Sequence, residues 1–272
     1  MIHEPILRPL LFISILLIMV ALEYCFPARK LITKPQSPSN KMRLMGNFGL
    51  ILLSGLIARF IFPLGLVAFA VYCNDQQWGL FNLLNISALL PSWLMIVFSL
   101  LLLDIMIYWQ HRLFHKIPLL WRLHKVHHAD PHVDASTGLR FHPLEIIASI
   151  IIKMILVFLL GVPVIAVILF EILLNGFALF NHANIRLPKK IEALTRTILV
   201  TQILHRIHHS QRLDESNCNF GFSVIWWDKI FGSYADKATQ TDAEIVIGLS
   251  EYPDAQQNAH LWGLLSMPFK RK

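Results

Sequence analysis

The sequence predicts an all-α integral membrane protein with about three transmembrane helices, a helical hairpin, and a cytoplasmic helical cap. Three observations predict this class: 55% of the 272 residues are hydrophobic, only 15% are charged, and the apolar residues gather in long runs. Soluble chains carry about 25% charged residues on average, so the polar residues here are too few to cover a globule in water. The runs therefore belong in lipid.

Three apolar runs are long enough to cross a bilayer as single helices. They are residues 10–26, residues 48–72 with Arg59 and Pro63 as interruptions, and residues 92–109 with Asp104 as the single charge. No A-x-A cleavage pattern follows the first run, so we interpret it as an uncleaved span rather than a signal peptide.

A fourth apolar stretch, residues 144–180, is too long for one span. As a straight helix of 37 residues it would measure about 55 Å, whereas a bilayer core is about 30 Å thick. The tripeptide Gly161–Pro163 lies near its midpoint, where a helix is expected to break. We predict two shorter helices that form a hairpin and return the chain to the side it left.

The distribution of basic residues predicts the sidedness. The loop between the first two spans carries five basic residues and the loop at residues 73–91 carries none. By the positive-inside rule the first loop is cytoplasmic. The third span then delivers His111 to the cytoplasmic face, and the hairpin returns His182 to the same face. The five basic residues are Arg29, Lys30, Lys34, Lys41 and Arg43.

Neither the net charge nor the cysteines indicate another class of function. The excess of 24 Lys and Arg over 17 Asp and Glu, a charge of +7, is explained by the positive-inside bias without a nucleic-acid partner. The three cysteines are far apart and form no C-x-x-C pair, so they predict neither a disulfide scaffold nor a thiolate metal site. We divide the chain into a transmembrane region at 1–92, a catalytic region at 93–240 and a cytoplasmic tail at 241–272.

Histidines are concentrated in three short boxes. Eleven of the thirteen lie between positions 111 and 209, and eight of these occur as one H-x-x-x-H and two H-x-x-H-H motifs. Residues three and four apart share a helix face, so each box can direct its imidazoles toward one place. The boxes are His111 and His115; His124, His127 and His128; and His205, His208 and His209.

The number of imidazoles predicts two metal ions. A structural zinc takes four ligands and a catalytic zinc takes three, so eight imidazoles on one face exceed what one ion needs. Adjacent histidines can then serve two neighbouring ions. Imidazole binds iron, zinc, copper and nickel, and the boxes alone do not distinguish them.

The motifs around the boxes resemble those of the fatty acid hydroxylase/sterol desaturase superfamily, in particular its sterol-desaturase-like branch. The resemblance extends in order over about residues 95–240 and includes segments outside the boxes. These segments are Asp104-Ile-Met-Ile-Tyr-Trp-Gln-His-Arg112, Trp121-Arg-Leu-His-Lys-Val-His-His128, Arg140-Phe-His-Pro-Leu-Glu145, Asn181-His-Ala-Asn184, Asn219-Phe-Gly221 and Trp227-Asp-Lys-Ile-Phe-Gly232.

The resemblance implies further site residues. Members of this superfamily place a metal ligand directly after the hairpin, which here is His182. They tend to have a second histidine nearby, but position 186 is Arg, so one ligand position is open; His142 either fills it or is a structural histidine before Pro143.

Three polar residues are candidates to support the ligands. Asp104 is a carboxylate inside a span, where such groups are usually functional or paired, so it either accepts a hydrogen bond from a ligating imidazole or pairs with an arginine. Glu145 either supports a ligand or favours the helix N-terminus as a negative charge. Asn184 is either a weak, water-mediated ligand or a turn residue.

The resemblance also implies the chemistry: an oxidoreductase with two iron ions that uses O2 to hydroxylate or desaturate a membrane lipid at a C–H bond. No G-x-G-x-x-G fingerprint or haem domain is evident, so a separate electron donor is expected: a ferredoxin, a cytochrome b5-like protein or a reductase. The alternatives are a zinc membrane hydrolase, although the box lacks the H-E-x-x-H glutamate, and a non-catalytic metal- or lipid-binding membrane protein.

Overall fold

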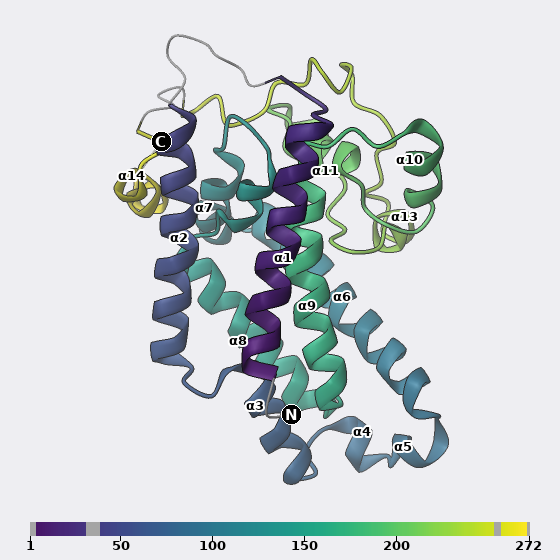
Figure 1. The fold of residues 1–272 in the computed structure, drawn as a ribbon. Coiled ribbons are helices and arrows are strands. Elements are labelled where there is room, and N and C mark those ends of the chain that lie inside the picture. The colour runs from purple at the N-terminus through teal and green to yellow at the C-terminus, as the bar shows by residue number, and fades with distance from the viewer. Residues whose placement is uncertain (1–3, 31–38, 253–256, 271–272) are drawn as a thin grey trace.

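The computed structural model describes residues 4–30, 39–252 and 257–270, and over these ranges its regular secondary structure consists of helices and three isolated β-bridges. Five helical segments are long and apolar enough to cross a membrane, which confirms the predicted all-α membrane class, while the side on which the cap lies stays a prediction. Figure 1 shows them as a bundle with shorter helices at its two ends. The long helices are α1 (Glu4–Cys25), α2 (Asn40–Ile61), α6 (Ser92–Lys116), α8 (Pro143–Leu160) and α9 (Val164–His182).

The second apolar run differs most from its prediction. Its helix begins eight residues earlier than expected, at Asn40, where the Ser39 side chain accepts a hydrogen bond from the Met42 amide and caps the first turn. It also ends at Ile61, because Pro63 has no amide hydrogen with which to continue the helix. The rest of the run forms α3 (Gly65–Asp75), followed by α4 (Leu80–Leu83) and α5 (Ile86–Leu89).

The long fourth stretch forms the predicted hairpin. Helix α8 ends at Gly161, which adopts the left-handed conformation with φ of 67°, and α9 begins after Pro163. Gly79 approaches this turn so closely that a Cβ atom there would lie 2.1 Å from the Gly161 amide nitrogen. Glycine at both positions therefore lets the hairpin tip meet the loop after α3.

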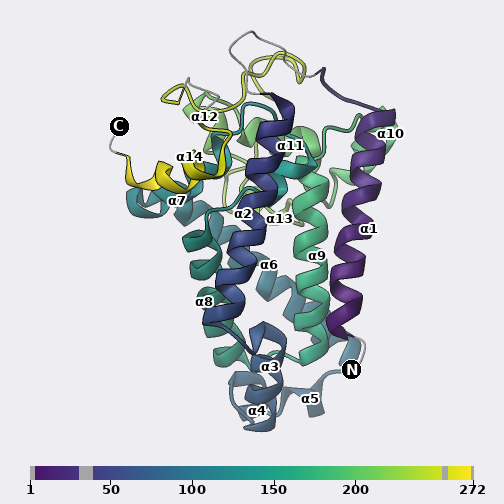
Figure 2. The ribbon, with the colours of Figure 1, turned by 60° about the vertical axis from the view of Figure 1, so that its left-hand side comes forward.

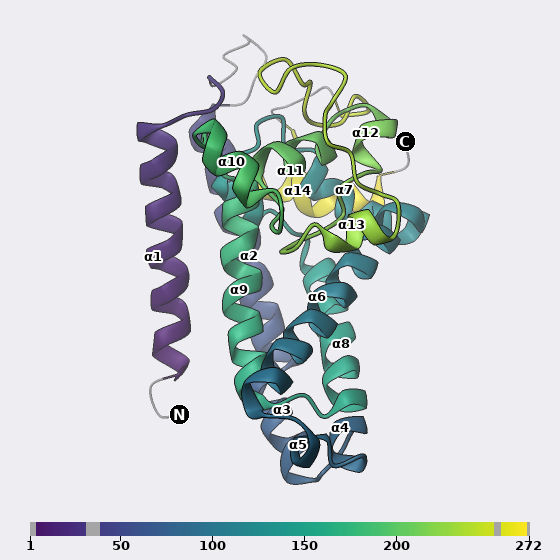
Figure 3. The ribbon, with the colours of Figure 1, turned by 90° about the vertical axis from the view of Figure 1, so that its right-hand side faces the viewer.

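The two ends of the bundle differ. At one end lie the C-terminus of α1, the N-terminus of α2 and a cap of short helices; α3, α4 and α5 lie at the other (Figures 1, 2 and 3). The basic residues after α1 thus lie at the same end as the cap, as the topology argument requires, although Lys34 is outside the described residues. The cap elements are α7 (Pro118–His128), η1 (Ala135–Leu139), α10 (Lys189–Thr195), α11 (Gln202–His208), α12 (Leu213–Ser216), α13 (Trp226–Ile230), α14 (Leu261–Ser266) and η2 (Met267–Phe269).

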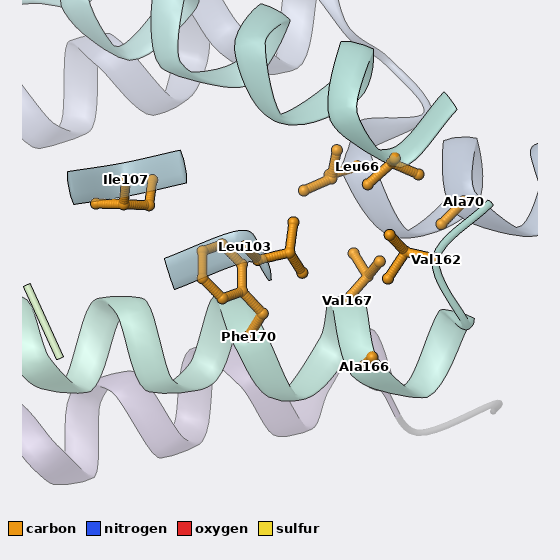
Figure 4. Packing of buried hydrophobic residues seen from close by; sticks show 9 residues of the cluster. Leu66, Ala70, Leu103, Ile107, Val162, Ala166, Val167 and Phe170 are labelled. Atoms are coloured by element: carbon orange, nitrogen blue, oxygen red, sulfur yellow. The ribbon is translucent and has the colours of Figure 1, made fainter. Parts of the chain in front are cut away.

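The main apolar core lies within the bundle, where side chains from α3, α6, α8 and α9 meet (Figure 4). By contrast, the outward faces of the spanning helices are apolar and exposed: Leu17 on α1 is 63% exposed and Phe60 on α2 is 86% exposed. Such a surface is stable only against lipid tails.

A network of buried ion pairs and hydrogen bonds connects α2 to the cap. The Arg43 guanidinium donates to Asp130 at 3.0 Å and also pairs with Asp134, while the Arg140 guanidinium donates to Asn47 at 3.1 Å. The C-terminal helix α14 packs on α2 as well, and Gly46 lies against the Ala259 carbonyl. Contacts thus cross the predicted boundaries at 92 and 240, and the division into three regions stays a prediction.

Candidate metal centre

Four helices carry the nine predicted histidines to one place. His111 and His115 lie one turn apart at the cap end of α6, beyond its most apolar part. Pro118 starts α7, whose last two turns carry the second box. His182 is the last residue of α9, and α11 ends in the third box with His209 as its C-cap. Eight of the nine side chains are buried and His115 is half-buried.

The nine histidines form two groups, within each of which one ring nitrogen per residue lies within 4.8 Å of the others. Each H-x-x-H-H box divides between them: His128 and His208 belong to the first group, and their neighbours His127 and His209 belong to the second. Adjacent histidines therefore face different groups. The first group is His111, His115, His124, His128 and His208, and the second is His127, His182, His205 and His209.

The second group is defined by four converging Nε2 atoms. His182 Nε2 lies 3.0 Å from that of His127, 2.9 Å from that of His205 and 3.3 Å from that of His209. A neutral imidazole has one N–H, so these contacts cannot all be hydrogen bonds. Four nitrogens at metal-bond lengths of 2.0–2.1 Å from one ion would be about 3.4 Å apart. The spacing therefore fits a four-coordinate cation.

The first group is anchored by its Nδ1 atoms. His111 Nδ1 bonds the Phe220 carbonyl at 2.9 Å, His208 Nδ1 bonds the Cys218 carbonyl at 2.8 Å, and His124 Nδ1 bonds Glu145 at 2.6 Å. A metal-ligating histidine usually donates its other ring N–H in this way, which fixes its tautomer and orientation. The Nε2 atoms of these three rings are buried with no hydrogen-bond partner among the described residues, as expected of metal ligands.

A left-handed residue presents the two carbonyls. Asn219 lies between Cys218 and Phe220 with φ of 52°, a conformation that asparagine tolerates better than most residues. Its side chain holds this turn by donating to the Leu204 carbonyl at 3.1 Å and by accepting from the Ala235 amide at 2.9 Å. The turn therefore holds His111 and His208 from the same side.

Burial keeps several of these imidazoles neutral. Desolvation, with a smaller contribution from neighbouring histidines, lowers the pKa of His127, His128, His205 and His209 well below the ordinary value. It lowers the pKa of His208 to about 3. Neutral imidazole is the form that ligates metal, so the donor set present at neutral pH suits two metal ions.

Of the three candidate supporting residues and the candidate ligand His142, one contacts a histidine of the two groups and three do not. Glu145 bonds His124 Nδ1 at 2.6 Å. Asp104 accepts a hydrogen bond from the Trp227 indole at 2.8 Å and, among the described residues, bonds neither an imidazole nor an arginine. Asn184 uses its side chain on the Arg29 backbone, donating to the carbonyl at 2.8 Å and accepting from the amide at 3.0 Å. His142 belongs to neither group: its Nδ1 caps α8 by accepting from the Leu144 amide.

One supporting network was not predicted. Asp228 accepts from the Phe220 and Gly221 amides at 2.8 and 2.7 Å and from the Ser233 hydroxyl at 2.7 Å. Burial, opposed by these bonds, raises the pKa of Asp228 to about 6. Asp228 and Ser233 thereby fix the loop behind His111; the W-D-x-x-x-G segment of the sequence was the available signal.

A cavity of about 270 Å³ leads from the histidines into the bundle. Its lining includes five of the nine histidines, with Phe114, Leu139 and Phe141 as apolar neighbours. It shares Phe12 and Ile51 with a larger groove of about 1030 Å³ between the spanning helices. An apolar chain in the bilayer would thus have a lateral path to the histidine groups.

Comparison with known proteins agrees with this architecture. A family model described as fatty acid hydroxylase matches residues 96–233. The chain is 29% identical over 184 residues to an ornithine lipid hydroxylase of Rhizobium tropici, covering 67% of this chain and 52% of the relative. It is 31% identical over 144 residues to human alkylglycerol monooxygenase, covering 53% of this chain and 30% of the relative. It is 30% identical over 140 residues to human cholesterol 25-hydroxylase, covering 51% and 50%.

The chain therefore spans about a third to a half of the length of these curated relatives. No solved structure matches the chain. The matched residues 96–233 include all nine histidines of the two groups.

Proposed function

Because the chain belongs to the fatty acid hydroxylase family, we propose that it is a membrane-bound di-iron oxidoreductase that uses O2 to hydroxylate a C–H bond of a lipid. The observation that carries this proposal is the pair of histidine groups at the head of an apolar cavity. All three relatives named above are described as hydroxylases or monooxygenases, which favours hydroxylation over desaturation.

We propose iron in both groups, with the nine histidines as ligands. All-nitrogen donor sets accept several transition metals, but oxidation of an unactivated C–H bond needs an ion that changes its oxidation state, which zinc does not. The iron pair would supply O2 reduction and C–H oxidation. Hydroxylation consumes one O2, two electrons and two protons, and it yields the alcohol and one water, so a separate electron donor is required: a ferredoxin, a cytochrome b5-like protein or a reductase.

The protein's own residues would bind and orient the lipid. Phe114, Leu139 and Phe141 line the cavity beside the histidines and would exclude water from the reacting carbon. Glu145 would hold His124 in the tautomer that presents Nε2 to the metal. Placement of the chain within the cavity, rather than a specialised acid or base, would then select the carbon that reacts.

We propose that the histidine groups face the cytoplasm. Support comes from Arg29, Lys30, Lys41 and Arg43, which lie at the cap end, while residues 73–91 at the opposite end contain no lysine or arginine. A cytoplasmic site would be accessible to soluble reductants. Accessibility of single cysteines placed at Lys30 and at Gln77 to a membrane-impermeant thiol reagent in cells tests this orientation; labelling of the Lys30 position from outside would reverse it.

The experiment that tests the function combines metal and product. The full chain, expressed with ample iron, is expected to contain two irons, and lipid extracts from cells that express it should gain a species 16 mass units heavier whose oxygen comes from 18O2. His208→Ala should abolish the product and remove the iron of the first group, whereas the exposed His260→Ala outside the groups should retain the product and both irons. Zinc alone in an active preparation, or an active H208A variant, would contradict the proposal. A loss of 2 mass units instead would assign desaturation.

A further inference from the structure

Two polar side chains line the cavity beside the histidines, and the proposed chemistry does not use them. Gln110 of α6 directly precedes His111, and Ser149 of α8 lies one turn beyond Glu145. The Gln110 side-chain amide donates through Nε2 to the Ser149 hydroxyl oxygen at 3.2 Å. We call Gln110 and Ser149 the polar pair. The polar pair connects α6 and α8 at the wall of the cavity.

The polar pair includes an acceptor that no donor satisfies. The Gln110 Oε1 atom is buried and has no hydrogen-bond partner among the described residues, and the same is true of Glu145 Oε2 on the wall of the same cavity. Native proteins pair nearly all buried polar atoms, because an unpaired one loses its hydrogen bonds to water without replacement. Amide and carboxylate oxygens are acceptors. The cavity therefore favours a ligand that donates an O–H or N–H group over a pure hydrocarbon.

The polar pair lies at the histidine end of the path that a lipid would follow. Ser149 is four residues from Glu145 along α8, about 6 Å at 1.5 Å per residue. Lys153 is eight residues from Glu145, about 12 Å, and Asn175 lies seven residues before the end of α9, about 10 Å. Both contact Glu171: the Asn175 amide donates to its carbonyl at 2.7 Å, and the Lys153 ammonium lies 3.5 Å from its carboxylate. The unpaired acceptors are thus concentrated next to the histidines.

The groove of about 1030 Å³ continues the path away from the cap. Its walls come from the first half of α1, the second half of α2 and α3, and these segments lie toward the end of the bundle opposite the cap (Figures 1 and 2). Most of the side chains that line it are apolar, Phe62 and Val67 among them. Its charged side chains contact other protein groups, since Arg8 pairs with Glu171 and Arg59 donates to a backbone carbonyl. The groove therefore suits a hydrocarbon chain.

The two parts of the path indicate how a lipid is oriented in it. We propose that the polar pair binds a hydroxyl or amide N–H group of the lipid while the hydrocarbon chain extends into the groove, so that a C–H bond close to this polar group meets the histidine groups. This inference rests on the proposed function for the nature of the reaction. It makes Gln110 a specificity-determining residue, and it narrows the substrate class to lipids that carry a hydrogen-bond donor near the reacting carbon.

Photo-crosslinking without O2 tests the orientation. The metal-loaded chain in phosphatidylcholine nanodiscs is exposed to hexadecanol that carries a diazirine either at carbon 3 or at carbon 15, and the labelling that excess unlabelled hexadecanol displaces is measured. The carbon-3 probe should label peptides that contain Phe114 and Phe141, and the carbon-15 probe should label peptides that contain Phe62 and Val67. The reverse pattern would place the distal chain at the histidines and overturn the proposal.

A second comparison tests the preference for a donor. At equal mole fractions below saturation, the carbon-3 alcohol should label the Phe114 peptide about fivefold more than its methyl ether, as expected of one neutral hydrogen bond. A second pair, hexadecanamide and its N,N-dimethyl derivative with the same label, tests an N–H source, and the pair that shows the preference identifies the donor. Equal labelling by both members of both pairs would overturn the proposal.

Variants of the polar pair decide whether Gln110 causes the preference. Gln110→Met keeps the length of the side chain but removes the amide oxygen, so labelling by the alcohol should fall to the level of the ether while labelling by the ether stays unchanged. Ser149→Ala should reduce the preference less, because it only releases the Gln110 amide, and the exposed control Gln240→Met should keep it. An alcohol-to-ether ratio in Q110M equal to that of the wild type would overturn the proposal, whatever the total labelling. Because no product is measured, failure of the oxygenase proposal would leave this result standing.

Discussion

The two histidine groups use the same side chain but are held in place differently. In the first group, three imidazoles donate Nδ1–H to Glu145 and to the carbonyls of Cys218 and Phe220. In the second, His182 alone has such an anchor, the Ala178 carbonyl at 2.6 Å, and the Nδ1 atoms of His127, His205 and His209 have no hydrogen-bond partner among the described residues. The first group is thus oriented by the protein, and the second depends more on its metal.

This difference indicates that the two proposed metal positions should differ in their affinity for metal. Hydrogen bonds to the far side of a ligating imidazole typically change metal affinity by about 10–100-fold. We therefore expect the ion in the second group to be bound more weakly and to leave first when a chelator is added.

The largest effect should come from removing a ligand in either group. His208→Ala in the first group and His205→Ala in the second should each remove one of the two irons and reduce product formation by at least about a hundredfold, because both ions are needed. Metal analysis and lipid mass spectrometry measure the two quantities, with His260→Ala as the control. Loss of both irons from H205A alone would show that the second group supports the first, reversing the comparison.

Acidification should destabilise both groups alike. The folded chain lowers the pKa of His208 to about 3, so as the pH falls below about 6.5 the unfolded chain takes up this proton before the folded chain does. Stability is therefore lost on acidification, by about 2 kcal/mol at pH 5 for this one histidine in the metal-free protein. Thermal unfolding of chelator-treated protein at pH 7.5 and pH 5 measures it; equal melting temperatures would contradict the burial argument.

Glu145→Gln should weaken the first group selectively. The amide keeps the shape of the side chain but loses the charge that strengthens the bond to His124, so iron affinity in the first group should fall about tenfold while the second group keeps its ion. Competition with a chelator, followed by metal analysis, gives both affinities. An unchanged iron affinity in the first group would show that Glu145 does not support the metal ligands.

Gly138→Ala should affect the second group instead. A Cβ atom at Gly138 would lie 2.5 Å from the Ala178 carbonyl oxygen, which anchors His182, and 3.4 Å from His182 Nδ1. Relieving this overlap should lower the free energy of unfolding by about 1 kcal/mol. Because His182 would shift, the affinity of the second group for its ion should fall about fivefold. The same chelator competition measures it, and a loss confined to the first ion would contradict the assignment of His182.

Asn184→Ala should have the smallest effect on either group. Its side chain bonds the Arg29 backbone rather than any histidine, so both irons should remain while the unfolding free energy falls by about 1 kcal/mol. Loss of iron in this variant would restore Asn184 as a supporting residue of the metal centre.

The long apolar runs and the helix-breaking residues of the sequence predicted the fold well. The apolar runs located five spanning segments, and Gly161–Pro163 located the hairpin turn, because helix length and helix breaking are local properties. The early start of α2 was missed because the chain before Phe48 is polar enough to resemble a loop; what extends the helix there is packing, with Arg43 and Asn47 buried against the cap. Such contacts join positions about ninety residues apart and leave no local signal.

The histidines of the site were predictable and their supports were largely not. Box spacing placed His127 and His128 beside each other facing different groups, which follows from helix geometry. Glu145 could be named because carboxylates are conspicuous in apolar runs, but the same argument led to Asp104, whose partner is the Trp227 indole. The carbonyls of Cys218 and Phe220 carry no side-chain signal, since every residue has a carbonyl.

Anomalous X-ray diffraction or an element-specific density map of the iron-loaded protein tests the central claim most directly. Data collected on both sides of the iron absorption edge should show two iron positions, one among His111, His115, His124, His128 and His208 and one among His127, His182, His205 and His209. A single iron, or zinc at both positions in protein that converts lipid with O2, would contradict it.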